Sequence, residues 1–164
     1  RQMCIRDSHY TLTPIGIDQD PHMRLARDLA PKAGMIKPAT IHSKYLHGLR
    51  GGKMSKSKEG SAIFLNEDPD KAAKFIMRAM TGGRDNVEEQ KKLGGVPDNC
   101  IVYEYLTAFF DSVKESKERY ERCKAGKVLC GEHKKELAEK MKKYLKDFQD
   151  KVKKNEKNID IYLM

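Results

Sequence analysis

Three lysines and two serines lie close together in a glycine-flanked segment, and these residue types suit the binding of phosphate. The segment has the sequence Gly-Gly-Lys-Met-Ser-Lys-Ser-Lys-Glu-Gly over residues 51–60. A lysine ammonium is a movable point charge for phosphate, a serine hydroxyl adds a neutral donor, and glycines allow a loop to close over a ligand. The alternative for so short a pattern is a solvated basic loop that holds no ligand.

The residues before this loop are predicted to form an α/β unit. Apolar and β-branched residues over 10–17 predict a strand, and the sequence Asp18-Gln19-Asp20-Pro21 predicts the N-cap and first-turn proline of a helix that ends at about Ala30. Residues 39–43 predict a second strand. Ligands of open α/β sheets bind beyond the carboxyl ends of the strands, and Asp18 and Gln19 follow such an end.

After the loop, residues 61–65 predict a short extended piece, and the rest of the chain is predicted to be helical. Asp68 and Pro69 begin a helix that is expected to end at Gly82-Gly83. Further helices are predicted over 101–110, 112–124 and 131–154. The last of them carries an apolar stripe that is most simply core, formed by Leu137, Met141, Tyr144, Leu145, Phe148 and Val152.

Composition narrows the class of protein. The 164 residues are 38% hydrophobic, which is enough for modest cores, and no apolar run approaches the roughly 20 residues that span a bilayer. We therefore expect a cytoplasmic protein without a membrane partner. The net charge is +9, and residues 111–158 hold 16 Lys and Arg against 10 Asp and Glu. This excess predicts a polyanionic partner, with a solvated lysine face as the alternative.

Two further motifs, together with the sequence of the loop, indicate a protein family. The loop contains Lys53-Met54-Ser55-Lys56-Ser57, which is identical to KMSKS, the second signature of the class I aminoacyl-tRNA synthetases. The chain also has Gly-Ile-Asp-Gln-Asp-Pro-His-Met-Arg over 16–24 and Gly-Gly-Arg-Asp-Asn-Val-Glu-Glu-Gln over 82–90. With these motifs it resembles the archaeal and eukaryotic tryptophanyl-tRNA synthetases from about Thr13 onward. Tyrosyl-tRNA synthetases have a related strand followed by Asp-Gln, so tyrosyl specificity is an enzymatic alternative.

The resemblance implies roles for the loop residues. Lys53 and Lys56 would be the catalytic ligands of the ATP phosphates, with Ser55 and Ser57 as lesser donors and Met54 as a packing anchor. ATP would bind with Mg²⁺, and the tryptophan carboxylate would attack the α-phosphorus. Preorganised cations would then stabilise the charge that develops on the departing pyrophosphate.

The resemblance also implies substrate contacts in the first unit. Gln19 would accept hydrogen bonds from the α-ammonium of tryptophan, and Asp18 would support that pocket. A carboxamide oxygen accepts such a bond without neutralising the reacting carboxylate. Helix capping is the alternative role for Asp18 and Asp20.

Three positions of the helical half would contact tRNA if the resemblance holds. Arg84 and Asp85 would read anticodon bases, because their donor and acceptor edges complement splayed-out bases. Lys134 matches a further RNA-contacting position, where a lysine mainly follows phosphate. An ion pair at a helix end is the alternative for Arg84 and Asp85.

Three cysteines and a histidine have a suggestive spacing. Twenty-two residues separate Cys100 from Cys123, six separate Cys123 from Cys130, and two separate Cys130 from His133. Some tryptophanyl enzymes hold an iron-sulfur cluster on four cysteines of this spacing, and here histidine stands in the fourth place. Three thiolates and an imidazole also suit tetrahedral Zn²⁺. The alternative is a set of reduced cysteines without metal.

The first signature of the class I synthetases, of the His-Ile-Gly-His type, does not occur in the sequence. We therefore expect a carboxyl-terminal fragment of α/β class that is inactive alone. Residues 1–66 would be the end of a Rossmann-like nucleotide-binding domain, with 1–8 aberrant or disordered, and 67–164 an all-helical anticodon-binding domain. The intact enzyme would be a homodimeric tryptophan-tRNA ligase. A non-catalytic tRNA-binding module is the alternative from another functional class.

Overall fold

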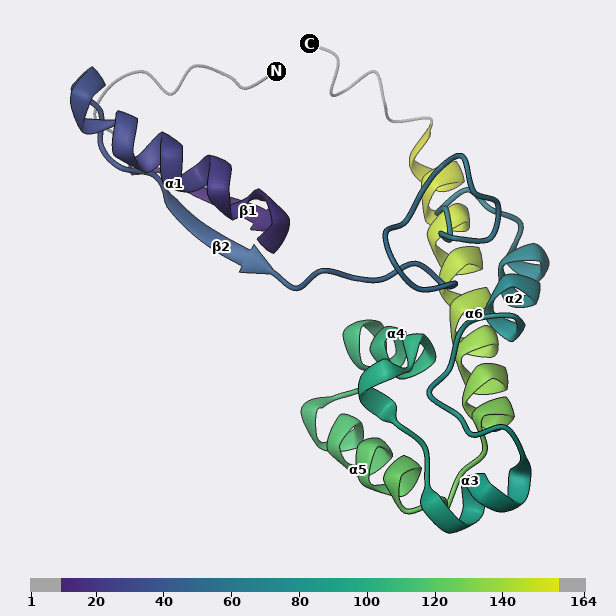
Figure 1. The fold of residues 1–164 in the computed structure, drawn as a ribbon. Coiled ribbons are helices and arrows are strands. Elements are labelled where there is room, and N and C mark those ends of the chain that lie inside the picture. Colours follow the sequence, from purple (N-terminus) through teal and green to yellow (C-terminus); the bar gives the residue numbers. More distant parts are fainter. Residues whose placement is uncertain (1–9, 157–164) are drawn as a thin grey trace. The chain divides into compact units, whose positions relative to one another are not determined.

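The computed structural model describes residues 10–156, so the prediction for residues 1–8 lies outside the described part. The chain forms two compact units that divide between Tyr45 and Leu46. Their helices and strands are drawn in Figure 1.

The first unit contains a two-stranded parallel sheet and a helix. Strand β1 (Leu12–Gly16) pairs in register with β2 (Ala39–Ser43), with Leu12 opposite Ala39 and Gly16 opposite Ser43. Between them lie the 3₁₀ turn η1 (Ile17–Gln19), helix α1 (Asp20–Leu29) and the 3₁₀ turn η2 (Pro31–Ala33). The predicted strand over 39–43 is confirmed, and the first strand is shorter than predicted.

The predicted capping of α1 is wrong. Gln19 is the N-cap residue, and its side chain makes no capping hydrogen bond. The Asp20 carboxylate bonds instead to His42 Nε2 at 2.9 Å and to Arg24 Nε at 2.6 Å. Asp20 therefore connects the helix to β2 rather than capping the helix.

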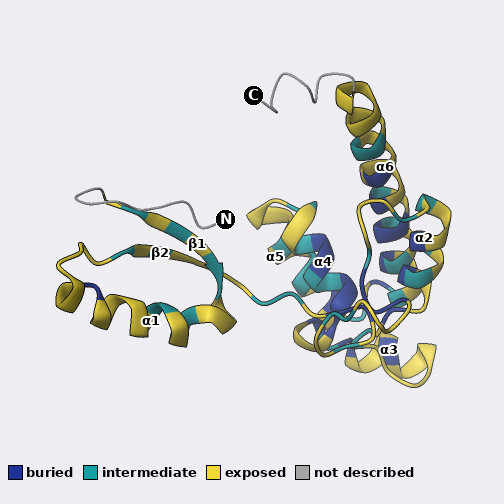
Figure 2. Ribbon diagram, turned by 90° about the horizontal axis from the view of Figure 1, so that it is seen from above, coloured by how far each residue is buried: buried dark blue, intermediate teal, exposed yellow. Residues whose placement is uncertain are grey.

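The first unit buries little apolar surface. Among the described residues of this unit, Ala30 is the only hydrophobic residue that is buried. Large apolar side chains stay exposed on β1, on α1 and on β2, including Leu12, Leu25 and Ile41. Figure 2 shows this unit almost entirely in the colours of exposed and intermediate residues. Its two strands and helix therefore form no independent core.

The second unit is helical. It contains α2 (Pro69–Met77), α3 (Val87–Leu93), the 3₁₀ turn η3 (Pro97–Asn99), α4 (Ile101–Phe109), α5 (Val113–Lys124) and α6 (Cys130–Glu156). The Asp68 carboxylate caps α2 by accepting from the Lys71 amide, as predicted. Ser112 and Glu115 form a capping box on α5, which fixes the predicted start of that helix.

One core joins α2, α4 and α6, with α2 packed along α6 (Figure 1). Its fully buried large side chains include Ile76, Leu106, Leu137 and Leu145. Leu49, which precedes the glycine-flanked loop, belongs to the same core and is also fully buried. Residues 46–66 thus pack with the helices, whereas the domain division predicted from sequence lies after residue 66 and remains a prediction.

Three predicted elements of this unit differ from the structure, and one helix was not predicted. Residues 61–65 form bends and turns rather than an extended piece. Helix α2 ends at Met77 rather than near Gly82, because the Met80 amide leaves the helix to donate to the Leu49 carbonyl. Helix α3 was not expected, since its sequence has no apolar periodicity. In the apolar stripe of α6, Tyr144 and Val152 are about half exposed.

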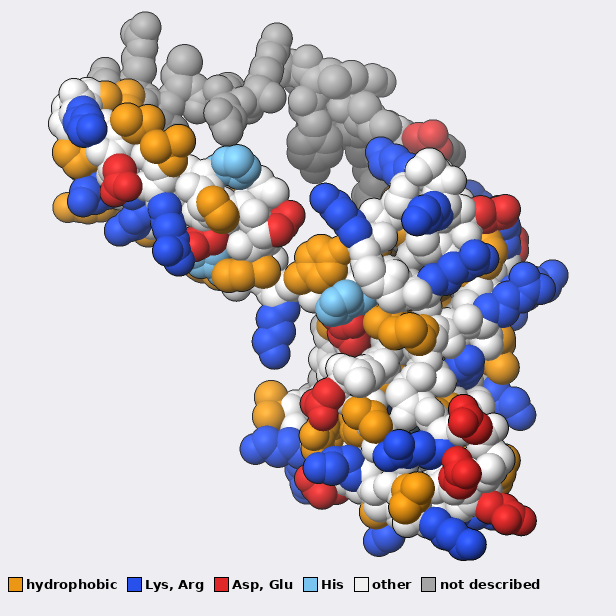
Figure 3. Space-filling view, viewed as in Figure 1, with side chains coloured by type: hydrophobic (Ala, Val, Ile, Leu, Met, Phe, Trp, Pro, Cys, Tyr) orange, Lys and Arg blue, Asp and Glu red, His pale blue; other side chains and the backbone are white. Residues whose placement is uncertain are grey.

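The charges of this unit are mixed on the surface. On the face that Figure 3 shows, Lys and Arg side chains alternate with Asp and Glu instead of forming one basic patch. None of the helices in the described part of the chain is both long and apolar enough to cross a membrane.

Candidate functional site

The glycine-flanked loop is built on a hydrogen-bonded frame. The Leu49 amide donates to the Ser61 carbonyl at 2.9 Å, so the two ends of the loop are joined. The buried Ser61 hydroxyl donates to the Ser55 carbonyl at 2.7 Å and accepts from the Ser55 amide at 3.2 Å. Gly51 and Gly52 both have positive φ, which an L side chain rarely adopts, so these positions need glycine. The frame fixes the middle of the loop through Ser55.

The far end of the loop is fixed to α2. Glu59 forms an ion pair with Lys71 at 3.0 Å. Gly60 has positive φ and lies so close to the Phe75 ring that a Cβ there would be 3.0 Å from it. A side chain at position 60 would therefore both strain the backbone and press on this ring.

The lysines of the loop remain available. Lys53, Lys56 and Lys58 are exposed, and their ammonium groups make no hydrogen bond or ion pair with the described residues. The hydroxyls of Ser55 and Ser57 lie 2.8 Å apart and bond to each other. Met54 is half-buried and packs against the core. The loop thus presents cations and hydroxyls from a base that is anchored by apolar packing.

Asp18 and Gln19 lie in the first unit, directly after β1. Both are exposed, and Gln19 Nε2 donates to Asp18 Oδ2 at 3.1 Å. The Gln19 carbonyl oxygen takes no part in this bond and can accept from an incoming donor. A Cβ at Gly16 would lie 2.5 Å from Asp18 Oδ1, so a side chain there would displace the Asp18 carboxylate.

Arg84 and Asp85 line a depression of about 540 Å³. The Arg84 amide donates to Gln90 Oε1 at 3.0 Å, and Arg84 Nε donates to the Gly94 carbonyl at 3.0 Å. Asn86 caps α3 by accepting from the Glu89 amide. The predicted alternative, an ion pair between Arg84 and Asp85, does not occur within the described residues. Both side chains are exposed.

The structure adds Lys135 to this depression, a residue that the sequence analysis missed. Lys135 lines it together with Arg84, Asp85 and Glu132. The predicted residue, Lys134, instead donates from Nζ to the Met77 carbonyl at the end of α2, at 3.2 Å. The helical spacing of the apolar residues along α6 is the sequence signal that could have separated the two lysines, because it shows which positions face the core.

The structure does not support the predicted metal site at Cys100, Cys123, Cys130 and His133. No group of three or more His, Cys, Asp or Glu side chains has metal-binding geometry in the described part of the chain. The three cysteines are free thiols, and burial raises the pKa of Cys123, which favours the thiol over the thiolate that a metal needs. Burial and the nearby Arg119 lower the pKa of His133, so the imidazole is neutral.

Comparison with known proteins connects these features. A protein-family profile described as tRNA synthetases class I (W and Y) matches residues 5–146. The chain is 47% identical over 154 residues to a tryptophan-tRNA ligase of Thermococcus sibiricus, covering 92% of the chain and 40% of that protein. It is 45% identical over 144 residues to a tryptophan-tRNA ligase of Methanocaldococcus jannaschii, covering 85% of the chain and 39% of that protein.

A solved structure agrees with the sequence relatives. The chain superposes on the crystal structure of tryptophanyl-tRNA synthetase from Aeropyrum pernix K1 with a TM-score of 0.82 and 43% identity, covering 88% of the chain and 41% of that structure. The described fold, mostly helical with a small parallel sheet, is therefore that of a class I tRNA synthetase. The chain spans about two fifths of the length of the curated relatives it matches.

Proposed function

The chain belongs to the class I tRNA synthetases of the tryptophan and tyrosine type, and we propose that it supplies the phosphate loop and the tRNA-binding helices of a tryptophan-tRNA ligase. The observation that carries the proposal is the loop at 51–60, whose exposed lysines are unpaired among the described residues on a fixed base. Curated relatives that cover most of the chain are tryptophan-tRNA ligases, which favours tryptophan over tyrosine.

In this proposal Lys53 and Lys56 hold the β- and γ-phosphates of ATP. Their charge stabilises pyrophosphate as it leaves, and Ser55 and Ser57 add hydroxyl donors. The loop fits phosphate better than it fits a metal ion, because its carboxylate, Glu59, is engaged by Lys71. Mg²⁺ would therefore arrive bound to the nucleotide, where it neutralises the phosphate oxygens.

The first unit would contribute to the amino acid site. Gln19 would accept from the α-ammonium of tryptophan through its free carbonyl oxygen, and Asp18 holds the Gln19 amide in place for that contact. This pair would orient the substrate so that its carboxylate, which must stay ionised, remains the attacking group. Residues 1–66 would form the end of a Rossmann-like domain.

The helical unit would bind the anticodon. Arg84 Nε is fixed on the Gly94 carbonyl, which leaves the terminal nitrogens of its guanidinium without a hydrogen bond among the described residues. These nitrogens and the Asp85 carboxylate offer donors and acceptors for the edges of unstacked bases. We assign the accompanying phosphate contact to Lys135 rather than to Lys134, whose ammonium is used on α2.

Activation of tryptophan would require residues beyond those of this chain, which has no signature of the His-Ile-Gly-His type. We expect no tryptophan-dependent pyrophosphate exchange from the purified chain. Exchange above background would show that this chain forms the adenylate unaided. The intact ligase would act in the cytoplasm as a homodimer.

Binding of the purified chain to tryptophan tRNA tests the tRNA half of the proposal. The affinity is measured across a salt series, for the native tRNA and for one with an altered anticodon, because salt separates phosphate contacts from base contacts. We expect weaker binding of the altered tRNA by the wild type. Arg84→Ala should lose this discrimination, at a cost of roughly 1–3 kcal/mol.

A matched pair of lysines sharpens the same experiment. Lys135→Ala should weaken binding to both tRNAs and reduce the salt slope by about one, as expected for the loss of one phosphate contact. Lys134→Ala should leave the slope unchanged. Equal and steeply salt-dependent binding of both tRNAs by the wild type would reduce the helical unit to a general basic surface, which is the alternative of a non-catalytic module.

A further inference from the structure

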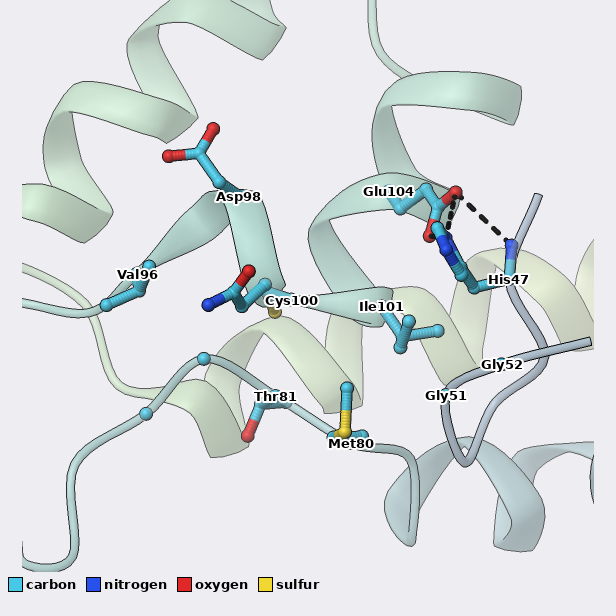
Figure 4. Close-up of a pocket in the computed structure, with 13 residues that line it drawn as sticks. His47, Gly51, Gly52, Met80, Thr81, Val96, Asp98, Cys100, Ile101 and Glu104 are labelled. Carbon is cyan, nitrogen blue, oxygen red and sulfur yellow. Dashed lines mark hydrogen bonds and ion pairs between the residues drawn. The ribbon is translucent and has the colours of Figure 1, made fainter. Parts of the chain in front are cut away.

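Residue 47, which lies just before the glycine turn of the phosphate loop, is held by α4 at three points. The Tyr105 hydroxyl donates to the His47 carbonyl at 3.0 Å. Glu104 accepts from the His47 amide at 3.3 Å, and its carboxylate lies 3.1 Å from His47 Nδ1. Figure 4 shows the imidazole lying against the Glu104 carboxylate, beside the turn at Gly51 and Gly52. Backbone and side chain of one residue are thus both fixed by a single helix turn.

The two residues of α4 that hold residue 47 do so with different strengths. Tyr105 is 3% exposed, and its ring packs on Phe109 with 5.8 Å between the ring centroids. Burial raises its pKa to about 12, so the hydroxyl stays protonated and donates. The Glu104 and His47 side chains are 27% and 48% exposed, so solvent screens their interaction. The tyrosine is therefore the main anchor and the glutamate a weaker one.

The anchored residue is connected to the lysines by a short path. The Gly48 amide donates to the Gly52 carbonyl at 2.9 Å, directly before Lys53. Leu49 is tied to Met80 through its carbonyl and to Ser61 through its amide. A shift of residue 47 would therefore move the turn that carries Lys53.

We propose that Tyr105, assisted by Glu104, is a positioning residue of the phosphate loop, which it holds by its base so that Lys53 and Lys56 meet the ATP phosphates. This inference rests on the proposed function of the loop. Neither residue is within the loop, and both lie on a helix of the unit to which we assign tRNA binding. The loop geometry is consequently set from α4 through a hydroxyl and a carboxylate.

Amide hydrogen exchange of the purified chain tests the anchor. The amides of Gly48, Leu49, Gly51, Ser55 and Ser61 are hydrogen-bonded in the loop or at its two ends, so opening of the loop is visible as faster exchange of these amides. Tyr105→Phe keeps the ring and removes one hydrogen bond. We expect the loop amides to exchange about 2- to 10-fold faster, the range for one such bond, and Glu104→Gln to have a smaller effect.

Tyr103→Phe is the matched control. Tyr103 lies on the same helix, and its hydroxyl donates to the Ser116 carbonyl at 3.3 Å and makes no hydrogen bond to the loop among the described residues. Exchange in the loop should not change in this variant, and exchange in α6 should not change in any of the three. Unchanged loop exchange in Tyr105→Phe, or an equal rise throughout the second unit, would overturn the anchor.

Titration with MgATP separates the anchor from the phosphate function. We expect ATP to slow exchange over 53–57, with a half-saturating concentration that rises in Tyr105→Phe and is unchanged in Tyr103→Phe. If Tyr105→Phe loosens the loop but ATP protects neither form, the anchor stands and the phosphate function of the loop fails. If ATP protects both forms at the same concentration, the loop binds phosphate and Tyr105 does not position it.

Discussion

The second unit uses its cations in two ways. On the helices, Arg119 donates to Asp111 at 2.6 Å and to Glu136 at 2.8 Å, and Lys140 bonds to the same two carboxylates at 3.4 and 2.8 Å. These groups connect the segment after α4 with α5 and α6. The Asp111 side chain is 2% exposed and that of Arg119 is 13% exposed. The cations of this network are committed to the fold.

The lysines of the phosphate loop have the opposite character. They are exposed and unpaired among residues 10–156, and the loop is held by backbone bonds, glycines and Met54 rather than by their charge. Positive charge alone therefore says little about function in this unit. The informative property is whether a cation is already satisfied by the folded chain.

The largest expected effect comes from breaking the buried network. Arg119→Met should lower the free energy of unfolding by about 3 kcal/mol, because it leaves the buried Asp111 carboxylate with Lys140 alone. Urea denaturation measures the change. Lys114→Met is the control on the same helix, since its pair with Glu118 is exposed and 4.0 Å long, and it should cost less than about 0.5 kcal/mol. Equal losses of unfolding free energy in the two variants would mean that the buried, paired cations stabilise the fold no more than the exposed ones do.

Acid should weaken the same network. The hydrogen bonds from Arg119 hold the pKa of Glu136 at about 2, below its ordinary value of 4.5. A lowered folded-state pKa stabilises the fold above the unfolded pKa, and this contribution is lost as the pH falls from about 4.5 toward 2. Because Glu136 is partly exposed, the slope it adds should stay well below the limit of about 1.4 kcal/mol per pH unit for one proton.

Glu136→Gln is the variant that isolates this contribution. It should be less stable than the wild type at neutral pH, and its stability should fall less between pH 4.5 and 2, as measured by urea denaturation at several pH values. Parallel curves for the two proteins would mean that Glu136 titrates normally and that the network is not strengthened by its charge.

Local sequence signals predicted part of this molecule well. The cap at Asp68, the start of a helix near residue 112 and the strand over 39–43 follow from residue type and short-range spacing, and the structure has them. The relation to the tryptophan enzymes followed from short motifs in the same way and is confirmed by the comparisons. These features depend on neighbours in the sequence.

Long-range contacts account for what the sequence did not predict. Helix α2 ends early because the Met80 amide bonds to Leu49, about 30 residues before it. The bond from Tyr105 to His47 joins residues that are 58 positions apart. Spacing along the chain carries no signal for such pairs.

The smallest expected effect on stability comes from removing the exposed lysines of the loop. The double variant Lys53→Ala and Lys56→Ala should unfold within about 0.5 kcal/mol of the wild type in urea, because neither ammonium contacts the described chain. The matched control is Lys71→Ala, which removes a lysine bonded to Glu59 at 3.0 Å and to Glu67 at 3.3 Å, and which should destabilise the protein more than the double variant does.

The same double variant should lose the protection of residues 53–57 by MgATP, whereas Lys114→Met on α5, whose lysine pairs with Glu118, should keep it. A stability loss above about 1 kcal/mol in the double variant would show that the loop lysines are committed to the fold after all. Exposed, unpaired lysines of the loop would then serve the fold as the buried cations do, and their lack of partners would not indicate ligand binding.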